Sequence, residues 1–484
     1  MHLKKIKKDI GFVLIITCLI ISMSNFGAMS SSLLHWLQYS SPEEVGWSSD
    51  ELENIRLEAD KIGSAAVMAV YKGHVLFAWG DVSRRYKCHS VRKSLLSALI
   101  GIYVDQGQIQ LDKTVAELGI DDISPLTDEE KESTVGDMLK ARSGIFHPAA
   151  KETSGIEGSR PKRGSHAPGE FFWYNNWGFN VLGLVFEQET GKKIFEDFKD
   201  KIADPLGMED YRIQDQFYQY ERSKSQHPAY AFRMSTRDLA RFGWMYLQNG
   251  QWNEQQIIPA GWIMESTTSY SDASPGTGYG YMWWNYPKGG MRQPDRYPVL
   301  NTYDKFAAIG TGGQIILIIP EAELVFVHRG DTDFSEGISG PPIWLMAEKL
   351  LEAKKHPPKP APELAPLKAI PFSHPSPPLP EWKEIVLSPE TLAKYEGEYK
   401  MEPRGSLFFR SLGNALEGWL VGQGEADFFP ASETRFFAKA ANVHLTFELD
   451  ENGEPISVVI NYMGKKMHGK KNIENSKKNI DIVE

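Results

Sequence analysis

Residues 90–107 read SVRKSLLSALIGIYVDQG and carry two signals in one short segment. After Lys93 the apolar residues recur at helical spacing, and Gly107 follows as a stop signal. The segment therefore predicts a buried helix that begins at Ser90. Residues three apart lie on one face of a helix, so the amine of Lys93 can reach the hydroxyl of Ser90.

A serine and a lysine held one turn apart suit acyl transfer. A serine hydroxyl is a weak nucleophile until an adjacent base takes its proton. A lysine can be that base only if burial or nearby positive charge lowers its pKa. The simpler alternative is that Ser90 only caps the helix. The same spacing recurs from Ser159 to Lys162, but in a Gly- and Arg-rich loop with an internal proline, where nothing fixes the geometry.

A second candidate is Tyr174-Asn175-Asn176, just before another predicted helix. Among nineteen tyrosines, Tyr174 alone has an asparagine two positions on. A tyrosine phenol can relay a proton between a nucleophile, a lysine and a leaving group. Asn176 can hold a substrate carbonyl or the lysine. The alternative is an aromatic loop that packs into the core.

A third candidate is Gly310-Thr311-Gly312-Gly313-Gln314, which leads into an apolar strand. Glycines at the start of a strand let a ligand approach the backbone closely. A backbone N–H here can share an oxyanion with the N–H of Ser90. The alternative is an ordinary tight turn.

The elements around these candidates predict a fold of the α/β (α+β) class. One predicted hairpin consists of two apolar runs, at 65–71 and 74–79, joined by Lys72-Gly73. A second consists of the runs at 314–319 and 324–328. Helices are expected at 48–62 and 343–353. Because the strands come from both ends of this region, we expect one antiparallel sheet flanked by helices, with a helical subdomain inserted between the hairpins.

The chain divides by composition into five parts. These are a signal peptide (1–28), a main domain (38–354), a Pro-rich linker (355–385), a small C-terminal all-β domain (386–470) and a polar tail (471–484). Lysines and then a short apolar run at 10–21 are typical of an export signal. We expect a periplasmic or extracellular protein, with retention as an N-terminal membrane anchor the alternative. Proline at the density of the linker should keep it out of any strand ladder.

The overall composition excludes some partners. The 484 residues have a net charge of −10 and no long basic stripe, so we expect no nucleic acid. His147, His166 and His227 lack metal-ligand spacing, and we expect no metal and no cofactor. If Cys18 leaves with the signal, Cys88 is alone and no intrachain disulfide forms.

In this order and at these intervals, the three motifs resemble those of the β-lactamase-like (penicillin-recognising) serine hydrolases. Flanking segments such as WGDVSRRYKCHSVRKS and AFRMSTRDLARFG resemble the 6-aminohexanoate-dimer hydrolase and carboxylesterase branch most closely. The resemblance implies Ser90 as nucleophile, Lys93 as base and Tyr174 as second proton carrier. It implies substrate or oxyanion contacts at Asn176, Thr311, Gly312, Gly313 and Gln314. The C-terminal region resembles lipocalin-like domains appended to some of these hydrolases.

One departure from the family pattern bears on the substrate. Thr311 stands where many members have lysine or histidine, which removes a charge for a substrate carboxylate. We therefore expect cleavage of small-molecule or short peptide-like esters or amides. The alternatives are a D-aminopeptidase or β-lactamase, and a penicillin-binding or sensor-type module that is acylated without turnover. An exported protein of this kind can lie close to a membrane or cell wall. The sequence makes no prediction of the oligomeric state.

Overall fold

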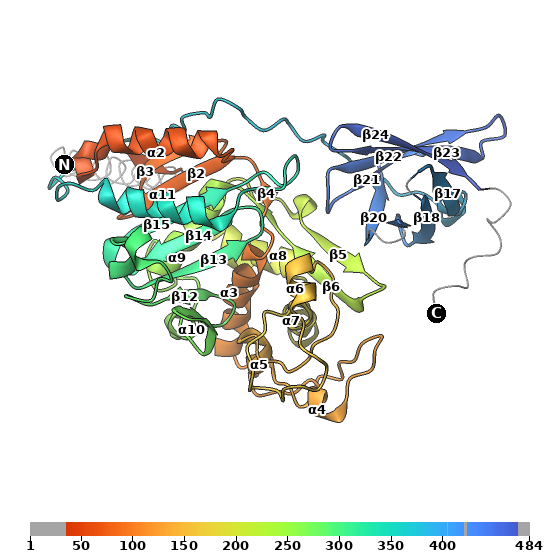
Figure 1. Ribbon diagram of the computed structural model, residues 1–484, viewed down its shortest axis with the longest axis horizontal. Helices are drawn as coiled ribbons and strands as arrows, with labels where there is room; N and C mark the ends of the chain where they lie inside the picture. The colour runs from red at the N-terminus through yellow and green to blue at the C-terminus, as the bar shows by residue number, and fades with distance from the viewer. Residues whose placement is uncertain (1–34, 404, 421–423, 473–484) are drawn as a thin grey trace, which may run out of the picture.

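The computed structural model describes residues 35–403, 405–420 and 424–472 (Figure 1). The predicted signal peptide and residues 473–484 of the predicted tail lie outside these ranges. In the described part of the chain, no helix is both long and apolar enough to cross a membrane.

A large sheet forms the centre of the main unit, and it contains both predicted hairpins. Within the described ranges it has ten strands. In spatial order these are β10 (Ser271–Ser274), β11 (Thr277–Tyr279), β12 (Trp284–Tyr286), β13 (Lys305–Gly310), β14 (Gln314–Ile319), β15 (Leu324–Arg329), β2 (Ala66–Tyr71), β3 (His74–Gly80), β1 (Leu37–Tyr39) and β16 (Leu364–Pro366). Strand β15 pairs with β2, which joins the two hairpins and so brings both ends of the region together.

The two faces of the sheet bury different side chains. In β2, Met68 and Val70 belong to one core cluster, whereas Val67 and Ala69 belong to the other. This alternation is the period of two that a strand buried on both faces requires. Helices α2 (Ser49–Lys61) and α11 (Gly340–Glu352) pack together on one face (Figure 1). Helices α3 (Val91–Asp105) and α9 (Thr236–Leu247) contribute to the core on the other face.

The predicted helical subdomain lies between the hairpins in the sequence. It contains α4 (Asp128–Lys131), α5 (Val135–Leu139), α6 (Ser154–Gly158), α7 (Asn176–Thr190) and α8 (Ile194–Phe198). After it come β5 (Phe217–Glu221), β6 (Ser225–Ala231), β7 (Arg233–Met234), α9 and α10 (Ala260–Ser266). Strand β7 pairs with β4 (Tyr86–Lys87), which leads directly into α3. Most of the subdomain helices are short, and α7 is the longer one that begins just after Tyr174.

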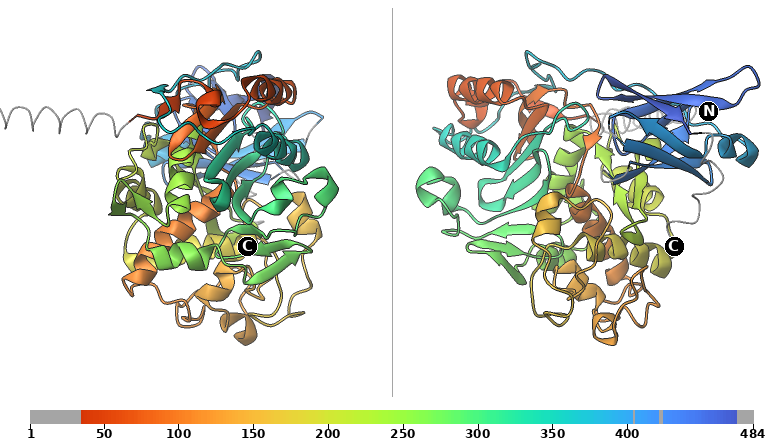
Figure 2. Two further views of the ribbon diagram at one scale, coloured as in Figure 1. Left: turned by 90° about the vertical axis from the view of Figure 1, so that its left-hand side faces the viewer. Right: turned by 45° about the vertical axis from the view of Figure 1, so that its right-hand side comes forward.

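The C-terminal region is a closed antiparallel barrel. Its strands are β17 (Gly397–Met401), β18 (Gly405–Leu412), β19 (Ala415–Leu420), β20 (Gly424–Pro430), β21 (Arg435–Ala438), β22 (Val443–Leu449), β23 (Pro455–Tyr462) and β24 (Lys465–Lys471). Buried aromatic side chains, among them Tyr399, Phe409 and Phe447, contribute to its core. The barrel lies beside the β5–β6 hairpin (Figures 1 and 2), where Arg222 pairs with Glu417 and Asp427.

The Pro-rich segment differs from the expectation. Strand β16 lies within it and pairs antiparallel with β1, and Ile370 bridges to Trp79. The argument that proline excludes this segment from any ladder was therefore wrong. Pro366 ends a three-residue strand at the edge of the sheet, where a missing N–H is tolerated. The pairing of β1 with β3 and the bridge from Ile370 to Trp79 are parallel, so the sheet is not wholly antiparallel.

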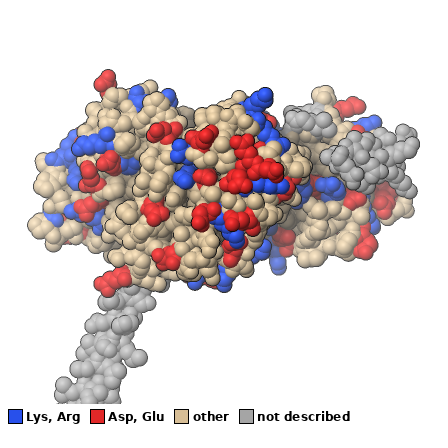
Figure 3. All heavy atoms as spheres, turned by 90° about the horizontal axis from the view of Figure 1, so that it is seen from below, with Lys and Arg blue, Asp and Glu red and all other residues tan. Residues whose placement is uncertain are grey.

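The surface carries charges of both signs. On the face shown in Figure 3, acidic and basic side chains are interspersed. Neither sign dominates that face.

Candidate active site

Ser90 lies at the start of α3, directly after a sharp turn of the backbone. His89 before it has a φ of 47°, in the left-handed region that few residues other than glycine adopt. Ser90 occupies the N-cap position, but its side chain makes no capping hydrogen bond. The alternative that Ser90 serves only as a helix cap is therefore wrong, and its hydroxyl is available for another partner.

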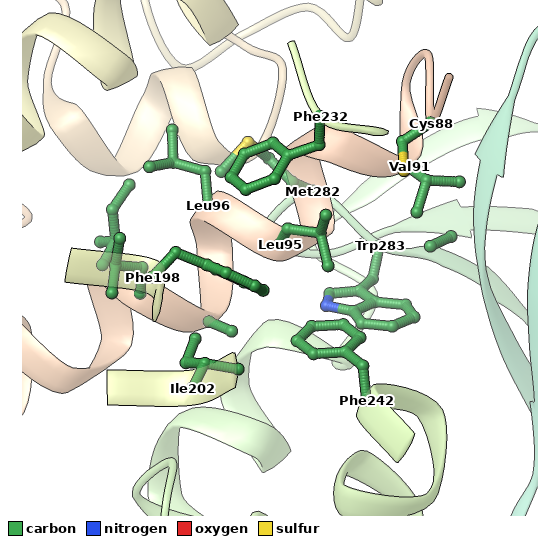
Figure 4. Close-up of a cluster of buried hydrophobic side chains, with 14 of the residues drawn as sticks. Cys88, Val91, Leu95, Leu96, Phe198, Ile202, Phe232, Phe242, Met282 and Trp283 are labelled. Atoms are coloured by element: carbon green, nitrogen blue, oxygen red, sulfur yellow. The ribbon is translucent and has the colours of Figure 1, made fainter. Parts of the chain in front are cut away.

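Helix α3 is buried along most of its length, as the sequence predicts. Val91, Leu95 and Leu96 pack in a cluster to which Phe232 and Trp283 also belong (Figure 4). The burial extends to the charged residues of the first turn, since Lys93 is 1% exposed. The packing of α3 thus fixes the position of the lysine and removes it from water.

Lys93 connects the first two motifs. Its Nζ donates to Ser90 Oγ at 2.9 Å and to Tyr174 OH at 2.7 Å. Burial, followed by the nearby positive charges of Arg92 and Lys151, holds the pKa of this amine well below its usual value. Among the described residues, no carboxylate contributes to the electrostatics of Lys93 in a way that would oppose this shift. The arrangement favours a neutral amine, which can accept the proton of Ser90.

Tyr174 lies two residues before α7 and points its hydroxyl at the lysine. Its ring stacks on Trp284 with centroids 5.4 Å apart. Burial raises the pKa of the phenol to about 12, so it remains protonated at neutral pH. A protonated phenol in contact with a neutral amine can pass a proton on.

The two asparagines after Tyr174 have different surroundings. Asn175 caps α7, because its side chain accepts from Trp177 N at 2.9 Å. Asn176 Nδ2 donates to the Lys151 carbonyl at 2.6 Å, and its buried Oδ1 has no hydrogen-bond partner among the described residues. Asn176 therefore holds the backbone at Lys151, and its Oδ1 is left without a partner among the described residues.

The glycine-rich turn lies against the nucleophile. A Cβ at Gly310 would lie 2.5 Å from the Cys88 carbonyl oxygen and 3.0 Å from Ser90 N, so only glycine allows this approach. Gly312 and Gly313 have φ angles of 78° and 87°. Gln314 is buried as a whole residue, and its side chain bonds to Gly330 O and Arg329 Nε. The Gln314 side chain is therefore committed to bonds within the protein.

A cleft of about 350 Å³ opens beside Ser90. It is lined by Ser90, Tyr174, Trp284, Ile309, Gly310, Thr311, Gly312, Gly313, Gln314, Ile315, Ile338, Ser339, Gly340, Ile343 and Trp344. None of these lining residues, all within the described ranges, carries a charge. Arg160, which could have supplied a cation from another loop, instead pairs with Glu152 at 2.6 Å. Asn176 is absent from the lining set, whereas the other predicted site residues, apart from the buried Lys93, belong to it.

Sequence reasoning missed three features of the site. Trp284 and Trp344 line the cleft, yet aromatic residues outside a motif give no distinguishing signal. Lys151 has a φ of 65°, and burial together with Arg92 and Lys87 lowers its pKa to about 7. His328 reaches the glycine-rich turn from the neighbouring strand. These contacts cross long stretches of sequence, and no periodicity predicts them.

Comparison with known proteins places the chain in a family. A family model described as Beta-lactamase matches residues 50–328. Among solved structures, the octameric penicillin-binding protein homologue from Pyrococcus abyssi has 18% identity and a TM-score of 0.46, over 87% of this chain and 99% of that one. A provisionally assigned 6-aminohexanoate-dimer hydrolase from Bacillus anthracis also has 18% identity and a TM-score of 0.46, over 66% and 90%. Since the family model covers more than half of its residues, the chain belongs to the Beta-lactamase family and is, in general terms, a serine hydrolase.

Proposed function

We propose that this protein cleaves small esters, and secondarily amides, through an acyl-enzyme on Ser90. The observation that carries the proposal is the position of Lys93 Nζ, within 3 Å of both Ser90 Oγ and Tyr174 OH in a buried site. An N-cap serine or a core tyrosine would not need this shared lysine.

The chemistry follows from these contacts. Ser90 Oγ attacks the substrate carbonyl carbon while its proton moves to Lys93 Nζ. The backbone N–H groups of Ser90 and Gln314 stabilise the oxyanion that forms. Tyr174 gives its proton to the leaving oxygen or nitrogen and takes one from Lys93, so the leaving group departs neutral. A water then attacks the acyl carbon and gives one proton to Lys93 Nζ, directly or through Tyr174. The bond from the acyl carbon to Ser90 Oγ breaks, Oγ takes that proton back, and the acid product leaves.

The lining of the cleft favours a substrate whose acyl group is neutral and apolar. Isoleucine and tryptophan side chains form much of its wall, and Thr311 brings no charge. Apolar walls with a few polar groups are typical of sites for small apolar ligands. We therefore propose short-chain esters as preferred substrates, rather than molecules that carry a carboxylate beside the scissile bond.

The test is covalent labelling with a fluorophosphonate probe, read by intact mass. The wild-type protein and a Ser159→Ala variant should gain one probe, and Ser90→Ala should gain none. Ser159 is the matched control, because it carries the same Ser-x-x-Lys spacing on an exposed loop. Labelling of Ser90→Ala at the wild-type rate would refute the proposed nucleophile.

Labelling alone does not separate an enzyme from a sensor that is acylated once. Steady turnover of p-nitrophenyl butyrate, many times over the enzyme concentration, is the result expected here. A single burst equal to the enzyme concentration, with no turnover after it, would instead indicate a sensor-type module.

We also propose export, on the basis of the lysines and the apolar run near the N-terminus. Expression of the full chain in a bacterial host should give a protein outside the cytoplasm that has lost its first residues, as mass spectrometry of the fractions can establish. Full-length protein confined to the cytoplasm would contradict this.

A further inference from the structure

We propose that His328 is a positioning residue that orients the Gln314 N–H, one of the two oxyanion donors, and that Arg329 holds the same turn from the other side. The inference rests on the proposed function, because it assigns a role to the donors of the acyl-transfer site.

His328 is completely buried and bonds on both ring nitrogens. Nδ1 lies 2.7 Å from the Gly313 carbonyl oxygen, and Nε2 lies 2.8 Å from Ser64 Oγ. A carbonyl oxygen can only accept, so Nδ1 carries the proton and Nε2 accepts from the Ser64 hydroxyl. Burial lowers the pKa of this imidazole to about 4, and the ring therefore keeps this single tautomer at neutral pH.

The contact from His328 to the Gly313 carbonyl bears on the oxyanion donor, because that carbonyl is bonded to the nitrogen of Gln314. The C=O of Gly313 and the N–H of Gln314 belong to one peptide group, which is planar and trans. In such a group the oxygen and the hydrogen point in opposite directions. A donor that fixes the direction of the Gly313 oxygen therefore fixes the direction of the Gln314 N–H as well.

On its Gln314 side this peptide is held by the β13–β14 ladder and by the Gln314 side chain, whereas its Gly313 side has no such support. Gly313 adopts a φ of 87° and lacks a side chain to anchor it. A bond donated to its oxygen holds one orientation among those that a glycine can adopt. It also polarises the peptide group, which strengthens the N–H on the opposite side as a donor.

Arg329, the next residue on β15, holds the turn from the other face of the sheet. Successive side chains on a strand point to opposite faces. The Arg329 guanidinium donates from Nε to Gln314 Oε1 at 2.6 Å, and from Nη2 to Tyr86 O at 2.9 Å and Lys87 O at 3.1 Å. It thus connects the residue that supplies one oxyanion donor to the segment that leads into Ser90, which supplies the other.

The bonds of Arg329 are all to neutral groups. Among the described residues no carboxylate pairs with it, although it is fully buried. Charged hydrogen bonds are shorter and stronger than neutral ones, so one guanidinium can hold both segments firmly.

The experiment compares His328→Leu with His328→Asn on p-nitrophenyl butyrate, with rates divided by the fraction of enzyme titrated in the burst. Loss of a whole oxyanion donor lowers kcat by about 10²–10³-fold. A misdirected donor should cost less, so His328→Leu should lower kcat by about 10- to 100-fold with KM changed less than about 2-fold. His328→Asn, whose amide can donate from near the Nδ1 position, should recover most of kcat.

His227→Leu is the matched control. His227 is also buried, and its Nε2 lies 2.8 Å from a backbone carbonyl, that of Asp121, outside the cleft. This variant should lose stability without losing kcat. If His328→Leu fails to fold, His328→Gln decides for the histidine, because its amide stays polar but cannot donate from the Nδ1 position, and its kcat should fall as predicted for His328→Leu. Gln314→Leu tests the Arg329 contact separately, because it removes that bond and keeps the backbone N–H. The kcat of Gln314→Leu should fall by about 10-fold, which is less than the loss expected when a whole oxyanion donor is removed.

The outcomes separate the two proposals. If wild-type protein forms no acyl-enzyme, the proposed function fails. If wild-type protein turns over and His328→Leu keeps its kcat, or if His227→Leu loses as much, the assignment of His328 as a positioning residue is wrong while the proposed function stands.

Discussion

At the scale of single residues, the site depends on keeping one lysine neutral. Lys93 is enclosed by α3 and by the rings of Tyr174 and Phe179, with its Nζ 4.3 and 4.8 Å from their centroids. Two further cations, Arg92 and Lys151, make protonation of Lys93 still less favourable. The Ser-x-x-Lys pattern identified the pair and contains Arg92, but Lys151 reaches the site through a tertiary contact and could not be read from the sequence.

The first prediction concerns the pH dependence of the reaction. Burial and neighbouring cations lower the Lys93 pKa, so the fraction of neutral base rises with pH through that lowered value. We expect kcat/KM for p-nitrophenyl butyrate to rise with pH and to level off well below the range where an ordinary lysine titrates. If kcat/KM instead rose only through the pH range where a lysine of ordinary pKa titrates, the role of Lys93 would be contradicted.

The second prediction concerns the two proton carriers themselves. Lys93→Ala and Tyr174→Phe should each lower kcat by about 10²-fold or more, because each removes a general acid–base step. Tyr174→Phe removes only a hydroxyl, so its thermal unfolding should remain cooperative. Near-wild-type turnover in either variant would show that the residue has another role.

At the scale of elements, the sheet shows where pattern reasoning succeeds and where it stops. The hairpins β2–β3 and β14–β15 were predictable, because long apolar runs flank clear turns. The short strands β1 and β16 at one side of the sheet were not, since each has only three residues and β16, the edge strand, contains a proline. Such strands exist because a neighbouring strand offers free backbone groups, which no local pattern reveals.

The third prediction concerns the turn between β13 and β14. Gly310→Ala should reduce turnover severely, because its Cβ would lie 2.5 Å from the Cys88 carbonyl oxygen beside the nucleophile. Gly261→Ala is the control, since a Cβ there meets nothing within 4 Å. Equal steady-state rates for both variants and the wild type would show that the turn does not need to approach Ser90 so closely.

The fourth prediction concerns Thr311 and the substrate. A charged hydrogen bond is worth about 1.5–3 kcal/mol, and about 1.4 kcal/mol is ten-fold in rate. The wild-type protein should thus hydrolyse p-nitrophenyl butyrate clearly and nitrocefin weakly or not at all. Thr311→Lys should raise kcat/KM for nitrocefin by about ten-fold relative to the ester. Faster turnover of nitrocefin by the wild type would contradict the argument from Thr311.

At the scale of the whole molecule, the boundary between the main unit and the barrel lies later than composition suggests. Phe372, in the Pro-rich segment, is 6% exposed and packs in the core beneath α2 and α11. Arg84 bonds to the carbonyls of Ser376 and Pro377. Trp382, in contrast, stacks on Phe437 of the barrel. The first half of the segment therefore belongs physically to the main unit.

The fifth prediction follows from that boundary. A chain that ends at Pro380 should fold and retain Ser90 labelling, because it keeps β16 and Phe372. A chain that ends at Lys355 should be less stable, since loss of one buried phenylalanine alone costs about 3–5 kcal/mol. Thermal unfolding of the two chains checks this. Equal stability would mean that residues 356–380 are only a linker.

The central claim is that a substrate acylates Ser90 and that water then removes the acyl group. The most direct measurement is to quench a reaction with p-nitrophenyl butyrate in its first turnovers and map the mass of the enzyme by peptide. We predict one butyryl group on the peptide that contains Ser90, which disappears as the substrate is consumed and never forms in Ser90→Ala. Turnover without any acylated Ser90 peptide, or a butyryl group at another residue, would contradict the account.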